Sequence, residues 1–157
     1  MRGENLFEQA HFVNLLPAVD LSGGKLTDVF HMKFHRWANI FIGIGVSAAA
    51  FTKIIVEACT DATGAGNEAI PYTLYKEETA AGDSFSAKED VTAAGYTPSA
   101  NNDIMYGIFV DSAQLPDDKP YVRVSLTNGA NSVIASAVAI LTGQRYTGAG
   151  NDQTVLT

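Results

Sequence analysis

Regular alternation of apolar and polar residues predicts β-strands through most of this chain, most clearly in its second half. In residues 104–111 (IMYGIFVD) every second side chain is large and apolar, which is the period of a strand with one buried face. The same period runs through 121–127 (YVRVSLT) and 133–141 (VIASAVAIL). Turns interrupt the pattern at 115–120, which holds two prolines, and at 128–131 (NGAN). We therefore expect three consecutive antiparallel strands here.

Further strands are predicted upstream of this block. Strand-like patterns occupy residues 27–37, 39–46, 52–59 and 69–76, whereas 77–102 is rich in small and polar residues and predicts exposed loops. About eight strands at short spacing, with no sustained helical pattern, predict an all-β fold, a two-layer antiparallel β-sandwich. The residues alone leave both jelly-roll and immunoglobulin-like connectivity open.

The two ends of the chain differ from this central domain. We expect an N-terminal arm over residues 1–26, a sandwich domain over 27–146 and a C-terminal tail over 147–157. The arm carries too many apolar side chains to leave in water, and they either fold back on their own domain or bind a neighbouring subunit. These side chains are Leu6, Phe7, Phe12, Leu15 and Leu16.

No grouping of residues predicts catalysis or a cofactor. The single cysteine, Cys59, lies within a predicted strand and is expected to be a buried apolar group. His31 and His35 would stand about 13 Å apart on a continuous strand, too far to share a metal ion, and His11 would be remote in the arm. Adjacent carboxylates such as Asp117 and Asp118 are typical of a solvated turn. We therefore expect no enzyme and no metal site.

Composition narrows the classes of partner. Charged residues make up 17% of the 157 residues, and the formal net charge is -7 with the basic residues scattered. A nucleic-acid-binding surface needs a stripe of Lys and Arg, and the scattered basic residues do not form one, so we expect no binding to nucleic acid. The N-terminus has no apolar core typical of a signal peptide, and the apolar run 38–51 is too short to cross a membrane.

The central block also resembles a known group of proteins. An aliphatic strand ends in Asp at 108–111 (IFVD), KPYVRVSLT follows at 119–127, and a Val/Ala/Ile strand closes in LTGQRY at 141–146. With the segment 26–59, this order is similar to that of capsid decoration, or cement, proteins of tailed bacteriophages and prophages. The chain departs from that group in its longer N-terminal arm and in the aromatic residues of 31–35. The resemblance favours jelly-roll-like connectivity.

The resemblance implies an adhesive function on the outside of a virion. Such a protein binds the outer surface of the major capsid protein shell, as a homo-oligomer (dimer or trimer), and bridges capsomers against internal DNA pressure. Anchors are then expected at both ends of the chain: Leu6, Phe7, Phe12, Leu15, Leu16, Arg145, Tyr146, Val155 and Leu156. Two other functions stay open: a host-surface or glycan-binding module, and a head–tail joining or tail structural protein.

Overall fold

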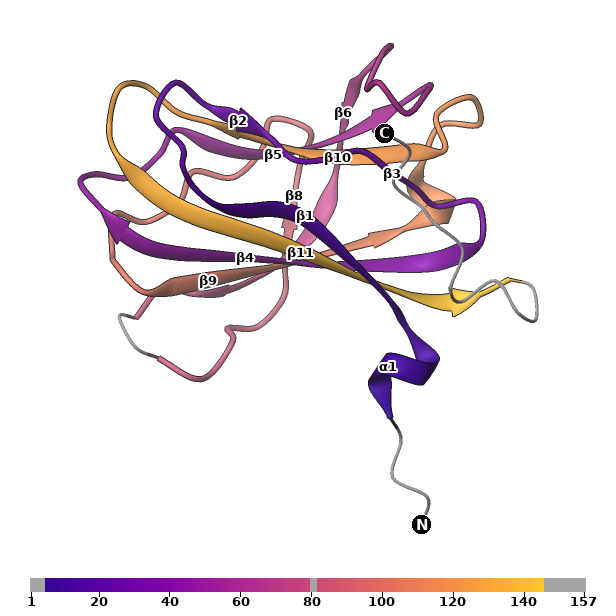
Figure 1. The fold of residues 1–157 in the computed structure, drawn as a ribbon, viewed down its shortest axis with the longest axis horizontal. Coiled ribbons are helices and arrows are strands. Elements are labelled where there is room, and N and C mark those ends of the chain that lie inside the picture. Colours follow the sequence, from indigo (N-terminus) through magenta and orange to yellow (C-terminus); the bar gives the residue numbers. More distant parts are fainter. Residues whose placement is uncertain (1–4, 80–81, 146–157) are drawn as a thin grey trace.

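The computed structural model describes residues 5–79 and 82–145, which form two antiparallel sheets packed face to face (Figure 1). The six-stranded sheet contains, in spatial order, β1 (His11–Asp20), β11 (Val133–Gln144), β4 (His35–Ser47), β9 (Ile104–Asp111), β7 (Tyr72–Glu77) and β8 (Glu89–Val91). The five-stranded sheet contains β2 (Lys25–Leu26), β10 (Tyr121–Thr127), β5 (Lys53–Cys59) and β6 (Glu68–Ile70), with β3 (Phe30–His31) also paired to β10. Two short helices complete the described chain: α1 (Leu6–Gln9) and the 3₁₀ helix η1 (Ser112–Gln114). The predicted all-β sandwich is confirmed.

The connections follow a jelly roll. The chain crosses repeatedly between the two sheets, so strands that are adjacent within a sheet come from distant parts of the sequence. In the six-stranded sheet β11 lies between β1 and β4, and in the other sheet β10 lies between β2 and β5. This is the double Greek-key order of a jelly roll, with β7 and β8 added at one edge, rather than an immunoglobulin-like order.

The core lies between the two sheets and uses the alternation seen in the sequence. On β9 the side chains of Ile104, Tyr106, Ile108 and Val110 are buried, as expected. On β10 the apolar positions of the 122–126 segment are fully buried, and on β11 the small alanines at 135–139 point into the same core. Burial of these faces supplies most of the stability of the fold.

The boundary of the expected N-terminal arm is wrong. Residues 11–20 form β1, which pairs with β11 along its length, and residues 25–26 pair with β10. Leu15 is 1% exposed and Leu16 is 8% exposed, both within the core cluster. The physical reason is that β1 covers the free edge of β11 and buries its apolar side chains, so within the described part of the expected arm only residues 5–10 precede the first strand.

The expected continuous strand over 27–37 is also wrong. The chain leaves β3 after His31, turns at 32–34 and enters β4 at His35. His31 and His35 are both buried, and the ring of His35 stacks on that of His11 with 5.7 Å between centroids. His11 is therefore near His35, because β1 and β4 both pair with β11.

The three strands of the central block are present but are not paired with one another as a meander. β9 and β11 both belong to the six-stranded sheet, where β4 separates them, while β10 belongs to the other sheet. The turns at 115–120 and 128–131 therefore connect the two sheets. Pro71 also lies at a crossing between the sheets, because β6 before it belongs to the five-stranded sheet and β7 after it to the six-stranded sheet. A residue without a backbone N–H suits a crossing where no ladder bond is required.

Candidate protein-binding interface

The expected anchor residues do not form one group. Leu15 and Leu16 lie in the core, whereas Leu6 and Phe7 are exposed on α1. Phe12 is half-buried on β1, and its ring stacks on that of Phe7 with 4.7 Å between centroids.

The C-terminal anchors are only partly described. The exposed Arg145 donates from its backbone N–H to the Phe34 carbonyl at 2.9 Å, and its guanidinium contacts the Ser112 hydroxyl. Tyr146, Val155 and Leu156 lie outside the described residues.

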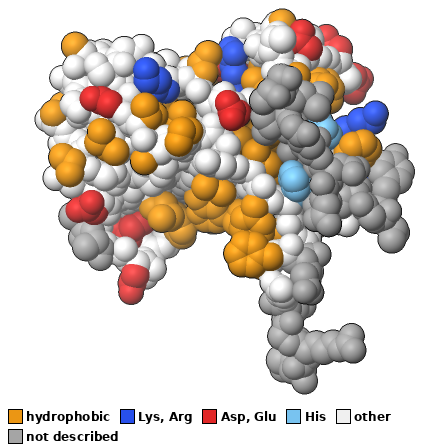
Figure 2. Space-filling view, in the orientation of Figure 1, with side chains coloured by type: hydrophobic (Ala, Val, Ile, Leu, Met, Phe, Trp, Pro, Cys, Tyr) orange, Lys and Arg blue, Asp and Glu red, His pale blue; other side chains and the backbone are white. Residues whose placement is uncertain are grey.

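The six-stranded sheet has a second apolar surface, on the side away from the core. Strand registry places Val138 of β11 beside Phe41 of β4, and Phe41 beside Gly107 of β9. The next row runs from Phe12 of β1 through Ile140 of β11. We call this surface the apolar face; its side chains are Phe12, Phe41, Tyr75, Met105, Phe109, Ile134, Val138 and Ile140. Figure 2 shows hydrophobic side chains gathered along the lower side of the molecule, between the loop after β7 and helix α1.

Two phenylalanines from outside the strands enlarge this surface. Phe7 of α1 covers Phe12, as described above, and is 76% exposed. Phe85, from the loop between β7 and β8, approaches Phe41 with 6.5 Å between ring centroids and lies over Gly107. Because Gly107 has no side chain, the ring of Phe85 can lie close to the sheet.

Glycine also hollows the apolar face. Gly43 and Gly45 on β4 stand where the outward side chains of a strand would be, and beside them lies a depression of about 400 Å³. Met105 and Ile134 form its apolar walls, and Glu77 adds a carboxylate at its rim. A depression between exposed apolar side chains can receive a side chain of a bound protein.

The two ends of the apolar face carry opposite charges. At the start of β4 the Arg36 guanidinium lies 5.1 Å from the centre of the Trp37 ring and 3.6 Å from the Asp111 carboxylate. A hydrogen bond from the Ala113 backbone N–H, another from the Trp37 indole and the nearby Arg36 charge hold the pKa of Asp111 below its ordinary value. Arg145 lies at this same end, since it contacts the residue after Asp111.

The opposite end is acidic. Glu77 pairs in register with Met105 at the end of β7, and Asp103 donates its backbone N–H to the Gly45 carbonyl at 3.2 Å. Between the ends, the outward positions of β1, β11, β4 and β9 hold no charged side chain among the described residues. The face is therefore an apolar strip with one acidic end and one end where two arginines outnumber the Asp111 carboxylate, which we call the basic end.

The edges of the sheets are poor places to add another strand. β1 carries Pro17 and has register shifts between Asn14 and Leu16 and between Leu16 and Val19. The other outer strands are short: β8 and β6 have three residues each, and β2 has two. Bulges, proline and short edge strands all oppose edge-to-edge pairing, so contact through a face is favoured.

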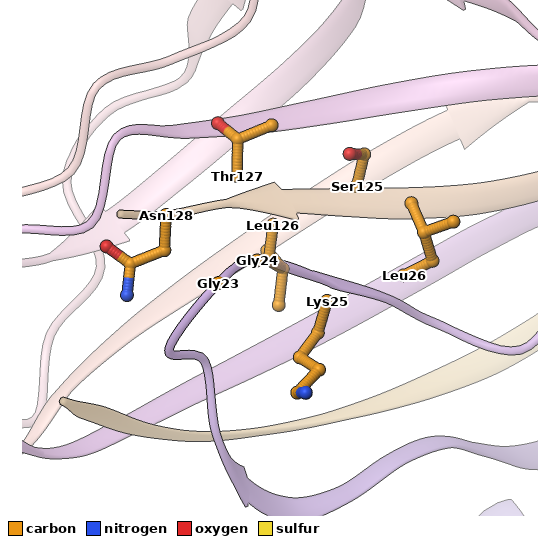
Figure 3. A pocket seen from close by; sticks show the side chains of 8 residues that line it. All are labelled: Gly23, Gly24, Lys25, Leu26, Ser125, Leu126, Thr127 and Asn128. Atoms are coloured by element: carbon orange, nitrogen blue, oxygen red, sulfur yellow. The ribbon is translucent and has the colours of Figure 1, made fainter. Parts of the chain in front are cut away.

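A second hollow lies against the five-stranded sheet. It has a volume of about 410 Å³ and lies beside β2 and β10 (Figure 3). In that view Ser125 and Thr127 point to one side, whereas Lys25 and Asn128 point to the other. Because these polar groups do not converge on one point, the hollow lacks the arrangement that orients a small ligand.

Two further groups, the Glu78 carboxylate and the Cys59 thiol, have structural roles. Glu78 accepts hydrogen bonds from the hydroxyls of Tyr96 at 2.9 Å and Tyr106 at 2.8 Å, which ties the loop after β7 to the core. Cys59 is buried, and burial raises the pKa of its thiol, so it is not a reactive nucleophile. Within residues 5–79 and 82–145, no three His, Cys, Asp or Glu side chains are grouped to hold a metal ion.

Comparison with known proteins does not assign the chain to a family. Neither protein-family models nor searches of curated proteins and of solved structures gave a match to this chain. In the part of the chain that the structure describes, no helix has the length and apolar character needed to cross a membrane.

Proposed function

We propose that this protein is a virion structural protein of the capsid-decoration class. It binds the outer surface of a major capsid protein shell, bridges neighbouring capsomers and stabilises the DNA-filled head. The observation that carries the proposal is the apolar face, a surface suited to a protein partner and not to a reaction. The order of segments in the central block, which resembles phage decoration proteins, supports the same function.

Three further properties support an adhesive function. Only 17% of the residues are charged, below the roughly 25% typical of soluble domains, which suits a protein covered by partners. The net charge of -7 keeps such a protein from binding the packaged DNA. The long strands β4, β9 and β11 are each paired on both sides, which favours a stiff platform for bridging capsomers.

The apolar face favours protein over glycan as the partner. The rings of the apolar face are mainly phenylalanines, and among its described side chains Tyr75 alone adds a hydroxyl, since Tyr72 and Tyr106 on the same strands are buried in the core. Sugar binding requires polar groups placed around an aromatic platform, and the polar side chains in Figure 3 point in different directions without such a ring among them. The glycan-binding alternative therefore has no observation in its favour.

The test is the number of copies that a head binds. Heads of the phage or prophage that encodes this chain are assembled without it, incubated with the purified protein, and analysed by quantitative gel electrophoresis and electron cryo-microscopy. We expect hundreds of copies on the outer surface and better retention of DNA on heating. A dozen copies or fewer, placed at the vertex that joins the tail, would instead identify a neck or tail protein. No binding at all would refute an adhesive function on the virion.

A further inference from the structure

We propose that the apolar face binds the same face of a second copy of this chain, with the strands of the two copies running in opposite directions. The inference rests on the proposed function, because it names a partner for the surface that carries that function. It goes further by fixing the surface, the symmetry and the orientation of a dimer. The argument for the dimer has three parts: the size of the face, its charges and the symmetry of the pair.

The first step concerns size. Met105, Ile134 and Val138 are 41%, 39% and 38% exposed although they lie on central strands, and Phe7 and Phe85 add exposed rings. Aromatic side chains carry on the order of 200 Å² each, so the exposed parts of the large side chains amount to roughly 500 Å². The largest apolar patch on a typical monomer is about 300–600 Å². Each partner in a stable interface contributes roughly 800 Å², so the dimer must also cover the half-buried side chains and the polar rim of the face.

The second step concerns charge. At its basic end the face has Arg36 and Arg145 against the one carboxylate of Asp111. At its acidic end it has Glu77 and Asp103, and apolar side chains lie between the two ends. A complementary partner therefore needs an apolar centre with acidic and basic ends in the reverse order. The same face of a second copy, turned end for end, has this distribution.

The third step concerns symmetry. A two-fold axis that relates two sheets stacked face to face lies in the plane between them. If the axis runs along the strands, Arg36 of each copy faces the basic end of the other and like charges repel. If the axis runs across the strands, Arg36 faces the acidic end with Glu77, and this contact forms twice. The charges therefore select the axis across the strands.

Self-association is measured first on the full chain in solution, without capsids, by sedimentation velocity over a range of concentrations. We expect a species of twice the chain mass. Val138→Glu places a charge at the centre of the face and should weaken the dimer about tenfold or more. Leu26→Glu is the matched control, because Leu26 is 52% exposed but lies on β2 in the other sheet. Circular dichroism verifies that each variant is folded.

Orientation is tested by charge reversal. Arg36→Glu should weaken the dimer at low salt, Glu77→Lys should do the same, and the double variant should restore association. Monomeric wild-type protein at all concentrations, or equal weakening by Val138→Glu and Leu26→Glu, would overturn the inference. Failure of the double variant to recover would overturn the antiparallel orientation.

The two proposals fail in different ways. A monomer that still occupies heads in hundreds of copies, and loses them on Val138→Glu, would show that the face binds the shell and not a second copy. A dimer disrupted by Val138→Glu that never binds heads would preserve this inference and remove the proposed function.

Discussion

The carboxylate of Asp20 holds the end of β1 against the start of β11. It accepts hydrogen bonds from the Ser132 hydroxyl at 2.8 Å and from the backbone N–H groups of Ser22 at 2.9 Å and Val133 at 3.2 Å. These three bonds, the one from Ser132 first, hold the pKa of Asp20 below its ordinary value. The charged form is thus favoured in the folded protein.

This arrangement predicts a loss of stability in acid. Because the folded-state pKa of Asp20 is below the unfolded value of about 3.9, its contribution is complete above the unfolded pKa and is lost as the pH falls through the folded pKa. Asp20→Asn should lower stability at pH 7 and make the decline between pH 5 and pH 2 shallower. Urea unfolding at each pH measures this, with Asp118→Asn on the exposed turn before β10 as the control. An unchanged slope would contradict the role of Asp20.

A second prediction concerns the hydroxyl of Tyr106. This side chain is fully buried, donates to Glu78 and accepts from the backbone N–H of Ser99 at 2.9 Å, and burial raises its pKa far above the ordinary range. Tyr106→Phe removes its two hydrogen bonds, while Glu78 keeps those from Tyr96 and Ser99, so the change should cost about 1 kcal/mol of unfolding free energy. Tyr75→Phe, on the exposed side of β7, should cost much less. Equal effects in urea unfolding would show that the Glu78 cluster does not hold the loop.

At the scale of elements, β1 belongs to the sandwich, and this gives a third prediction. Deletion of residues 1–10 removes α1 and should leave the sandwich folded, because no strand is lost. Deletion of residues 1–20 removes β1 with its buried Leu15 and Leu16, and each such side chain is worth about 2–5 kcal/mol. A small domain has only about 5–15 kcal/mol in total, so the longer deletion should unfold the protein. Far-UV circular dichroism and thermal melts distinguish the two; a folded 21–157 chain would contradict the importance of β1.

Most individual strands were predictable from sequence, since β9, β10 and β11 follow a strict period of two. β1 was not, because Pro17 and its two bulges break that period. Strand partners were not predictable either. The neighbours of β4 in the sheet are β11 and β9, which lie far along the chain. The alternation of apolar and polar residues in β10 does not predict which of the two sheets it belongs to.

The apolar face was missed for a related reason. On β11, Val138 and Ile140 point outward, whereas the alanines at 135–139 point into the core. Because both sets of side chains are apolar, the sequence of this strand is also typical of a strand buried on both faces. The sequence likewise does not show whether Phe41 and Phe109 point into the core or out of it. Only the register of the sheet places these side chains together on one uncovered surface. Of the expected anchors, Phe12 lies on this surface and Phe7 stacks on it at the border, and their role as anchors stays a prediction.

At the scale of the whole molecule, a face that pairs with itself makes stability depend on concentration. Binding between folded copies stabilises the folded state by an amount that grows with the logarithm of protein concentration. The Tm of the wild-type protein should therefore rise as the concentration increases a hundredfold, whereas the Tm of Val138→Glu should stay constant. Leu26→Glu should follow the wild type, because its substitution lies on β2 in the other sheet. Scanning calorimetry at several concentrations provides the measurement. A constant Tm for the wild-type protein would show that the apolar face does not bind a second copy and would leave a different protein as its partner.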